Sequence, residues 1–227
     1  TTSNFTTNNF LTLLSGWKLT HTWQIEILSL YTTAAVDVTL ETIAKEGTRV
    51  GPTVIRNIAD INQIVEIDVS PERILASPEL ISRYIIKAGN RMMIYYLDSD
   101  ERNEEPELIF RNSFGCRESF VPKGLVERQN EYENTTGYIR DMLFRFRTKE
   151  IKKFEANTGI LSENHGQWAE DLFVSNEVFL KILSDLVPVT ITDATVVRSN
   201  APDELISFDF KYQLSRPNLY GAGKIDI

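Results

Sequence analysis

The sequence has 227 residues, of which 42% are hydrophobic, 25% charged and 10% aromatic, and its formal net charge is −8. This composition is typical of a folded globular protein and excludes collagen-like and low-complexity classes. Cys116 is the only cysteine and there are two histidines, which argues against a disulfide-rich module or a metal centre built from such side chains. We therefore expect no cofactor and no metal. The acidic balance disfavours bulk binding to nucleic acid.

The sequence also disfavours insertion into a membrane. Its longest apolar runs are far shorter than the roughly 20 residues that a spanning helix needs, and no basic segment followed by an apolar one opens the chain. We expect no membrane span and no export signal. The polar stretch 1–9 is expected to be an arm or a tail.

After residue 9, the commonest pattern in the sequence is an alternation with a period of two residues. Alternation of apolar and polar residues predicts strands that have one buried face and one face in water, and β-branched and aromatic runs add further strands. These segments lie at 23–27, 65–69, 85–86, 93–96, 144–147, 190–192 and 206–212. A hairpin turn is predicted at 88–91 and a short helix or turn at 71–76. Because turn residues recur between the strands, we expect a mainly β fold, either an antiparallel sandwich or barrel-like sheets.

The acidic stretch 98–107 predicts a long exposed loop and a boundary near residue 105. The chain would then divide into an N-terminal β region at 1–105 and a C-terminal β region at 106–227, with a single domain as the alternative. Calcium prefers closely spaced oxygen ligands, but Arg102 and Asn103 occupy positions where an EF-hand loop needs an acid and a glycine. A solvated acidic loop is favoured, and cation binding stays open.

The segment 140–153 is locally basic and alternates arginine with phenylalanine. Such a ribbon can stack on bases and contact phosphates, but the alternation favours a two-faced strand with Phe144 and Phe146 inward and the arginines in water. On an acidic protein it can also pair with acidic loops of a neighbouring copy. The predicted subunit interface consists of Arg145, Arg147, Lys149, Asp98, Asp100 and Glu104.

One helix is predicted, at about 162–174. Ser162 can cap its first turn, and one apolar face is expected to cover a sheet edge or to plug one end of a barrel. The residues of that face are Trp168, Ala169, Leu172 and Phe173.

No recognised catalytic signature occurs, whether a phosphate-binding glycine loop, a nucleophile elbow or a zinc-protease helix. Cys116, His165 and Asp171 have the side-chain types of a nucleophile, a base and an orienting acid. A buried, inert Cys116 and a surface His165 are favoured instead. We expect the protein not to be an enzyme. The rival is a hydrolase in which two carboxylates converge in a pocket.

The stretch from Leu108 to Leu214 joins β-rich runs by polar turns around the single helix. Within it, the segments 110–115, 154–159, 172–178 and 187–193 resemble virion and tail structural proteins of tailed bacteriophages. This resemblance implies a non-enzymatic subunit that forms rings with itself and with other tail or neck proteins, such as a distal tail, hub, baseplate or neck component. It also implies localisation in the virion after assembly in the host cytoplasm.

The alternative function is a carbohydrate-binding β-sandwich that recognises a host surface. Trp17, Trp23 and the tyrosines supply aromatic faces that such a surface needs, although residues of this kind are more often core or interface anchors.

Overall fold

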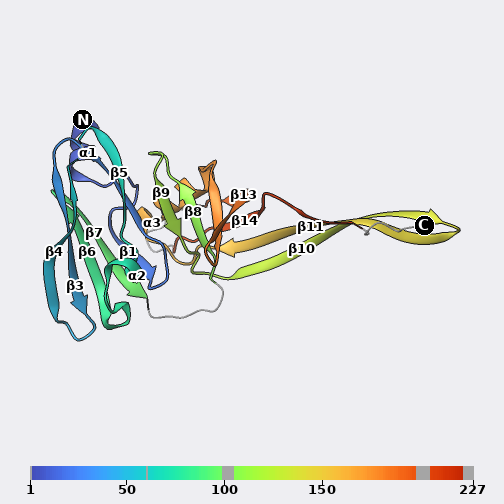
Figure 1. Ribbon diagram of the computed structural model, residues 1–227, viewed down its shortest axis with the longest axis horizontal. Coiled ribbons are helices and arrows are strands. Elements are labelled where there is room, and N and C mark those ends of the chain that lie inside the picture. Colours follow the sequence, from blue (N-terminus) through green and yellow to red (C-terminus); the bar gives the residue numbers. More distant parts are fainter. Residues whose placement is uncertain (1, 60, 99–104, 198–204, 222–227) are drawn as a thin grey trace.

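The computed structural model describes residues 2–59, 61–98, 105–197 and 205–221 of the chain. Strands hold 59% of the residues and helices 11%, which confirms the mainly β fold class. The strands form a five-stranded sheet, an eight-stranded sheet and a two-stranded ribbon, and no closed barrel occurs among the described residues. Figure 1 shows the two larger sheets beside each other along the long axis, with a long hairpin extending from the second.

The five-stranded sheet has the order β1-β7-β6-β3-β4. Its first pair, β1 and β7, is parallel, and the other pairs are antiparallel. The strands are β1 (Gly16–His21), β3 (Val36–Ala44), β4 (Arg49–Ile58), β6 (Ile81–Ala88) and β7 (Arg91–Asp98). The antiparallel ribbon consists of β2 (Ile27–Thr32) and β5 (Gln63–Asp68). Two short helices, α2 (Pro71–Ile74) and η1 (Pro78–Leu80), connect β5 to β6.

Alternating side chains of these strands fill the N-terminal core. Val65 and Ile67 of β5 are buried while the acids between and after them are half-exposed, which confirms the strand predicted at 65–69. In the next hairpin, Tyr84 and Tyr95 are fully buried and stack with ring centroids 4.8 Å apart. Gly89, in the predicted turn at 88–91, has a φ of +60° that favours glycine.

The polar start of the chain is folded onto this region. Residues Thr2–Asn8 form helix α1, and the Arg91 guanidinium donates hydrogen bonds to the carbonyl oxygens of Thr6, Asn9 and Tyr31. The prediction of an arm at 1–9 is therefore wrong for the described residues 2–9. A guanidinium on β7 satisfies the carbonyl groups at the end of the helix, a contact that local sequence does not reveal.

The eight-stranded sheet has the order β10-β11-β14-β13-β12-β8-β9, and β15 pairs with β11. All of its pairs are antiparallel. The strands are β8 (Glu107–Arg111), β9 (Arg117–Phe120), β10 (Val126–Ile139), β11 (Met142–Asn157), β12 (Val178–Ile182), β13 (Asp185–Thr195), β14 (Asp209–Leu214) and β15 (Asn218–Gly221). These strands all follow residue 106, whereas those of the five-stranded sheet all precede residue 99.

Helix α3 (Glu163–Val174) confirms the predicted helix, and the Ser162 side chain caps it by accepting a hydrogen bond from the His165 amide. Leu172 and Trp168 are buried on one face. The Trp168 ring packs 5.2 Å from Phe120 of β9, centroid to centroid. The apolar face of the helix thus covers the eight-stranded sheet, as an amphipathic helix among strands requires.

Candidate functional site

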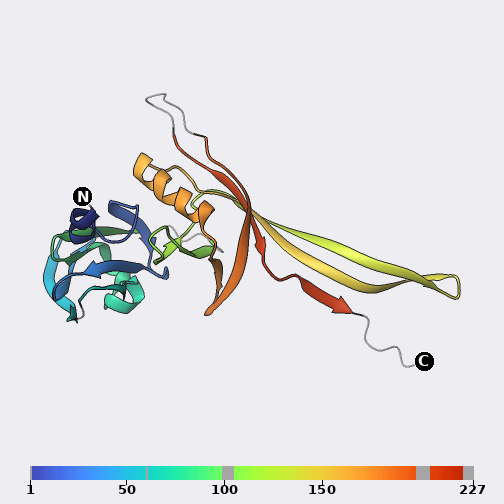
Figure 2. The same ribbon diagram turned by 90° about the horizontal axis from the view of Figure 1, so that it is seen from above.

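Strands β10 and β11 form a hairpin that projects far beyond the rest of the molecule (Figures 1 and 2), and we call residues 126–157 the hairpin arm. Fourteen residues of β10 pair with β11, a length of about 46 Å at roughly 3.3 Å per residue. The turn residues Arg140 and Asp141 have φ values of 49° and 63°, which are characteristic of the tight turns that suit the twist of a hairpin.

The far end of the hairpin arm is apolar and exposed. Tyr138 is 75% exposed, and even the least exposed of these side chains, Phe144, is 36% exposed. We call this group the apolar tip; it consists of Tyr138, Ile139, Met142, Leu143, Phe144 and Phe146. The prediction that Phe144 and Phe146 point into a core is wrong, because no layer of the described residues packs on the strand that carries them at this point.

Contacts within the hairpin arm keep it regular. Gly137 leaves room for the Phe146 ring, since a Cβ atom at that position would lie 2.7 Å from a ring carbon. Closer to the base, Glu150 accepts hydrogen bonds from Tyr132, Asn218 and Tyr220, which lower the pKa of its carboxyl group. The tip has no such polar partners among the described residues, and cross-strand pairing joins its two strands.

The predicted interface residues separate into two groups. Arg145 and Arg147 are exposed and make no side-chain hydrogen bond or ion pair with the described part of the chain. Lys149 instead binds Glu133 of the same hairpin at 3.0 Å. Asp98 binds Lys123 at 3.1 Å, and Asp100 and Glu104 lie outside the described residues. Of the predicted interface residues that the structure describes, only the two arginines are therefore exposed cations without a side-chain hydrogen bond or ion pair in the described part of the chain.

A second surface feature lies where β1, β9 and α3 meet. A hollow of about 110 Å³ opens there and is lined mainly by apolar and aromatic side chains. We call it the aromatic groove; its principal residues are Trp17, Leu19, Phe120, Ile160, His165 and Trp168. Trp17 is 45% exposed and Ile160 is 70% exposed, so the groove presents apolar surface to solvent.

His165 is an integral part of this groove. Its ring lies 4.3 Å from the Trp17 ring, centroid to centroid, and its Nδ1 is 2.7 Å from the Ser162 hydroxyl. The prediction of a surface His165 is wrong, because the side chain is buried under Trp17. Burial lowers the pKa of the imidazole, so the ring is neutral at physiological pH.

Charged residues stand at the mouth of the groove. Lys123, which lines the groove, lies beside His21 and binds Asp98. His21 Nε2 is 2.7 Å from Glu105 Oε2. Burial, and then the Lys123 charge, lowers the pKa of His21. Among the described residues, the carboxylates of Asp98 and Glu105 here face the Lys123 ammonium and a neutral imidazole.

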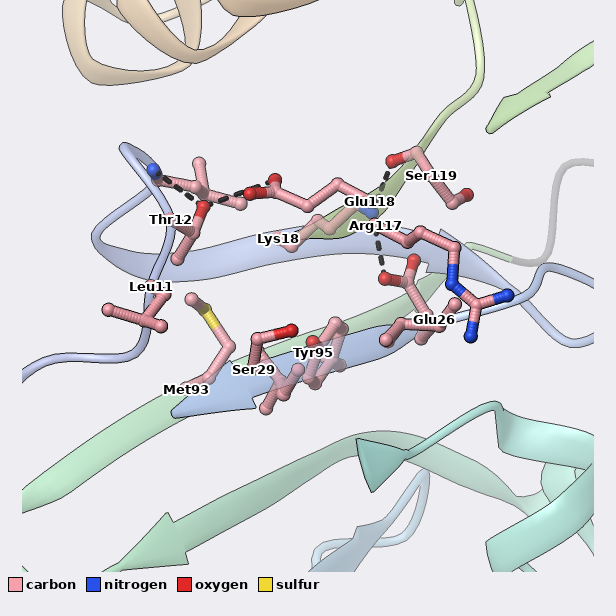
Figure 3. Close-up of a pocket in the computed structure, with 13 residues that line it drawn as sticks. Leu11, Thr12, Lys18, Glu26, Ser29, Met93, Tyr95, Arg117, Glu118 and Ser119 are labelled. Atoms are coloured by element: carbon pink, nitrogen blue, oxygen red, sulfur yellow. Dashed lines mark hydrogen bonds and ion pairs between the residues drawn. The ribbon is translucent and has the colours of Figure 1, made fainter. Parts of the chain in front are cut away.

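Behind the groove, a buried polar seam joins the two large sheets (Figure 3). Lys18 Nζ of β1 donates hydrogen bonds to Glu26 at 2.7 Å and to the Ser119 carbonyl of β9 at 2.6 Å. The same ammonium lies 5.0 Å from the centre of the Trp168 ring. Glu118 accepts hydrogen bonds from Thr12 and from the Trp168 indole. The seam therefore ties the N-terminal segment to β9 and α3.

Two carboxylates converge in this seam, which is what the hydrolase alternative requires. Glu26 and Glu118 line one hollow, but its volume is about 10 Å³, which is room for about one water molecule. Burial raises the pKa of Glu26 to about 7 and also raises that of Glu118. The hollow has perturbed acids but no space for a sugar ring or a peptide.

The three residues with the composition of a catalytic triad have different partners. Cys116 is buried, and burial raises the pKa of its thiol. Asp171 accepts hydrogen bonds from the amide and hydroxyl groups of Ser113, and His165 lies with Ser162 and Trp17. No contact joins Cys116 to either of the other two among the residues that the structure describes.

Sequence patterns missed both the seam and the length of the arm. The alternation at 23–27 predicts a strand with Trp23, Ile25 and Ile27 buried, yet Gln24 and Glu26 are the buried residues and β2 begins only at Ile27. The available signal for the arm is the segment 126–139, where a strand-length stretch has hardly any apolar residues before its last two positions.

Among the described residues, no helix has the length and apolar character to cross a membrane. No known protein-family model matches the sequence, and no curated protein is significantly similar to it.

Proposed function

We propose that this protein is a non-enzymatic structural subunit of a tailed-bacteriophage virion, a tail or neck component that forms rings with itself and with neighbouring tail proteins. The hairpin arm is the observation that carries this proposal. It places an apolar tip and two arginines that have no ion pair in the described part of the chain far from the body of the subunit, in a position to reach another chain.

The energetics of the arm support a role in assembly. A two-stranded hairpin is marginally stable in water unless a further layer or strand packs on it. Exposed apolar side chains gathered at one place are the usual mark of an interaction site. A neighbouring subunit that covers the tip would remove this surface from water and order the strands, as arms in closed assemblies do.

The rest of the described chain supports a scaffold more than a catalyst. The hollow with perturbed carboxylates holds about one water molecule. In the polar seam around it, hydrogen bonds join Lys18 of β1 to β9 and Trp168 of α3 to β9. Such a network stabilises one arrangement of the two sheets, which a subunit with fixed neighbours needs.

The test compares the full chain with a variant whose arm is shortened. Asn134 and Thr148 are directly paired, so replacing residues 135–147 by Asn-Gly closes the hairpin with a two-residue turn in register. We expect light scattering to give a mass well above 26.0 kDa for the full chain at high concentration, with rings or tubes in negative stain, and a monomer for the variant. A full chain that stays monomeric at all concentrations contradicts the proposal.

The second candidate is carbohydrate binding on a host-recognition device. The exposed Trp17 at the aromatic groove favours it, since an aromatic face beside polar groups such as Lys123 and Ser162 is a platform on which a sugar ring can stack. Glycan-array binding by the shortened-arm monomer, abolished by Trp17→Ala, would establish this function. An array without signal would remove it.

A further inference from the structure

We propose that the aromatic groove is the docking site for the apolar tip of a second copy of this chain. The inference rests on the proposed function and adds the surface that receives the arm. The groove exposes the apolar side chains of Trp17, Leu19 and Ile160, and the tip exposes its own apolar cluster. Each surface therefore has the chemistry that the other needs to become buried.

The size of the groove fits a side chain of the tip. An apolar cavity of about 150 Å³ holds benzene, so the groove, at about 110 Å³, fits one aliphatic chain such as that of Met142 or Leu143. These two residues stand next to the turn of the hairpin, 59% and 60% exposed. The wider aromatic side chains behind them would then lie against Trp17 and Ile160 at the groove mouth.

The arm does not reach the groove of its own chain. Figures 1 and 2 show it extending away from β1 and α3, the elements that carry Trp17 and Trp168, in both views. A tip that enters this groove must therefore belong to another molecule. Because the tip and the groove are different surfaces, repetition of the contact is head-to-tail, and such contacts close into rings or continue as filaments.

Charge favours the same pairing. The hairpin arm carries seven Lys and Arg against six Asp and Glu, a net charge of +1 in a chain of −8, which leaves −9 on the rest. Arg140, Arg145 and Arg147 are exposed cations of the tip region, and the carboxylates of Asp98 and Glu105 lie next to the Lys123 that lines the groove. Complementary charges steer such an encounter and fix its orientation.

Cross-linking of mixed variants tests the contact. Met142→Cys places a thiol on the tip, Ile160→Cys places one on the groove, and Val54→Cys places one on exposed β4 as a matched control. Cys116 is buried and stays in all chains. One variant of each mixture carries an affinity tag. After mild oxidation we expect at least tenfold more disulfide-linked tip–groove pairs than tip–control pairs.

The outcomes separate this inference from the proposed function. Equal yields of tip–groove and tip–control cross-links, or a majority of tip–tip dimers, would overturn the docking site. If light scattering before oxidation still showed oligomers, the proposed structural role would stand. The absence of any oligomer would overturn both. Glycan binding by the shortened-arm monomer that Trp17→Ala abolishes would make the groove a sugar site and would also overturn the inference.

Charge reversal supplies a second readout. Arg145→Glu combined with Arg147→Glu should lower the yield of tip–groove cross-links at least fivefold in low salt. Lys149→Glu is the control, because Lys149 already pairs with Glu133 in its own hairpin. An unchanged yield in the double variant would contradict the charge contribution to docking.

Discussion

The polar seam and the hairpin arm both place side chains in surroundings opposite to their usual ones. In the seam, the charged Lys18, Glu26 and Glu118 are buried, whereas Phe144 and Phe146 of the arm are exposed. Buried charges are tolerated only when paired and hydrogen-bonded, and exposed aromatics are retained where a partner covers them. The seam thus holds one subunit together, and the arm is available to another.

The largest expected effect is on the seam. Lys18→Met leaves Glu26 buried without its cation, and breaking such a pair costs about 3–5 kcal/mol. At pH 8, urea unfolding should show a free energy of unfolding lower by about this amount. The matched arm variant Lys149→Met breaks the exposed pair with Glu133 and should cost less than about 1 kcal/mol. Equal losses would remove the distinction between the two regions.

The pH dependence of stability gives the next largest effect. In the folded protein the pKa of Glu26 is about 7, above its ordinary value of 4.5, so folding takes up a proton between these values. The stability that this provides is fully present below pH 4.5 and is lost as pH rises through about 7. Relative to Glu26→Gln, the wild type should lose about 3 kcal/mol across this window.

Urea titrations of both proteins at several pH values between 4 and 8 measure that difference. The buried Glu118 is present in both, so its own titration largely cancels. If the free energy of unfolding changed with pH in the same way for the wild type and Glu26→Gln, the carboxyl group of Glu26 would titrate normally and would not be desolvated in the seam.

Trp168→Phe should have an intermediate effect. It keeps most of the ring packing against Phe120 but removes the indole N–H that Glu118 accepts. Loss of one partner of a buried acceptor costs about 1–3 kcal/mol. Glu118 also accepts hydrogen bonds from Thr12 and Asn112. A change of less than about 0.5 kcal/mol in the free energy of thermal unfolding would mean that these two donors satisfy Glu118 without the indole.

The smallest effect on stability is expected in the arm. Phe144→Ser combined with Phe146→Ser should change the free energy of unfolding by less than about 0.5 kcal/mol, as exposed positions do, while abolishing the oligomer in light scattering. The control Phe110→Ala, in the core, should cost about 3–5 kcal/mol. A large loss of stability in the double serine variant would assign the tip to the fold of its own chain.

Local pattern predicted much of the fold because many elements obey it. The strand at 65–69, the turn at 88–91 and the helix capped by Ser162 each depend on neighbours within a few residues. The alternation at 144–147 also predicted a strand, but periodicity says only that two faces differ. It does not say whether anything covers either of them, so the exposure of Phe144 was not predictable.

The groove and the seam depend on contacts that are remote in sequence. Lys18 meets Ser119 across about a hundred positions, and Trp17 meets His165 across still more. At 23–27 the polar Gln24 and Glu26 face inward because the seam supplies their hydrogen-bond partners. The buried and exposed faces of this segment are therefore the reverse of those expected. Of the predicted interface residues that the structure describes, Lys149 and Asp98 are paired within the chain, whereas Arg145 and Arg147 have no ion pair there.

Hydrogen–deuterium exchange, compared between dilute and concentrated solutions of the full chain, tests the central claim most directly. The account predicts that amide protection rises with concentration in peptides covering 138–146 and 158–168, the tip and the groove, while the seam strand β9 is protected at both concentrations. Protection that does not change with concentration, or that rises in β4 instead, would contradict it.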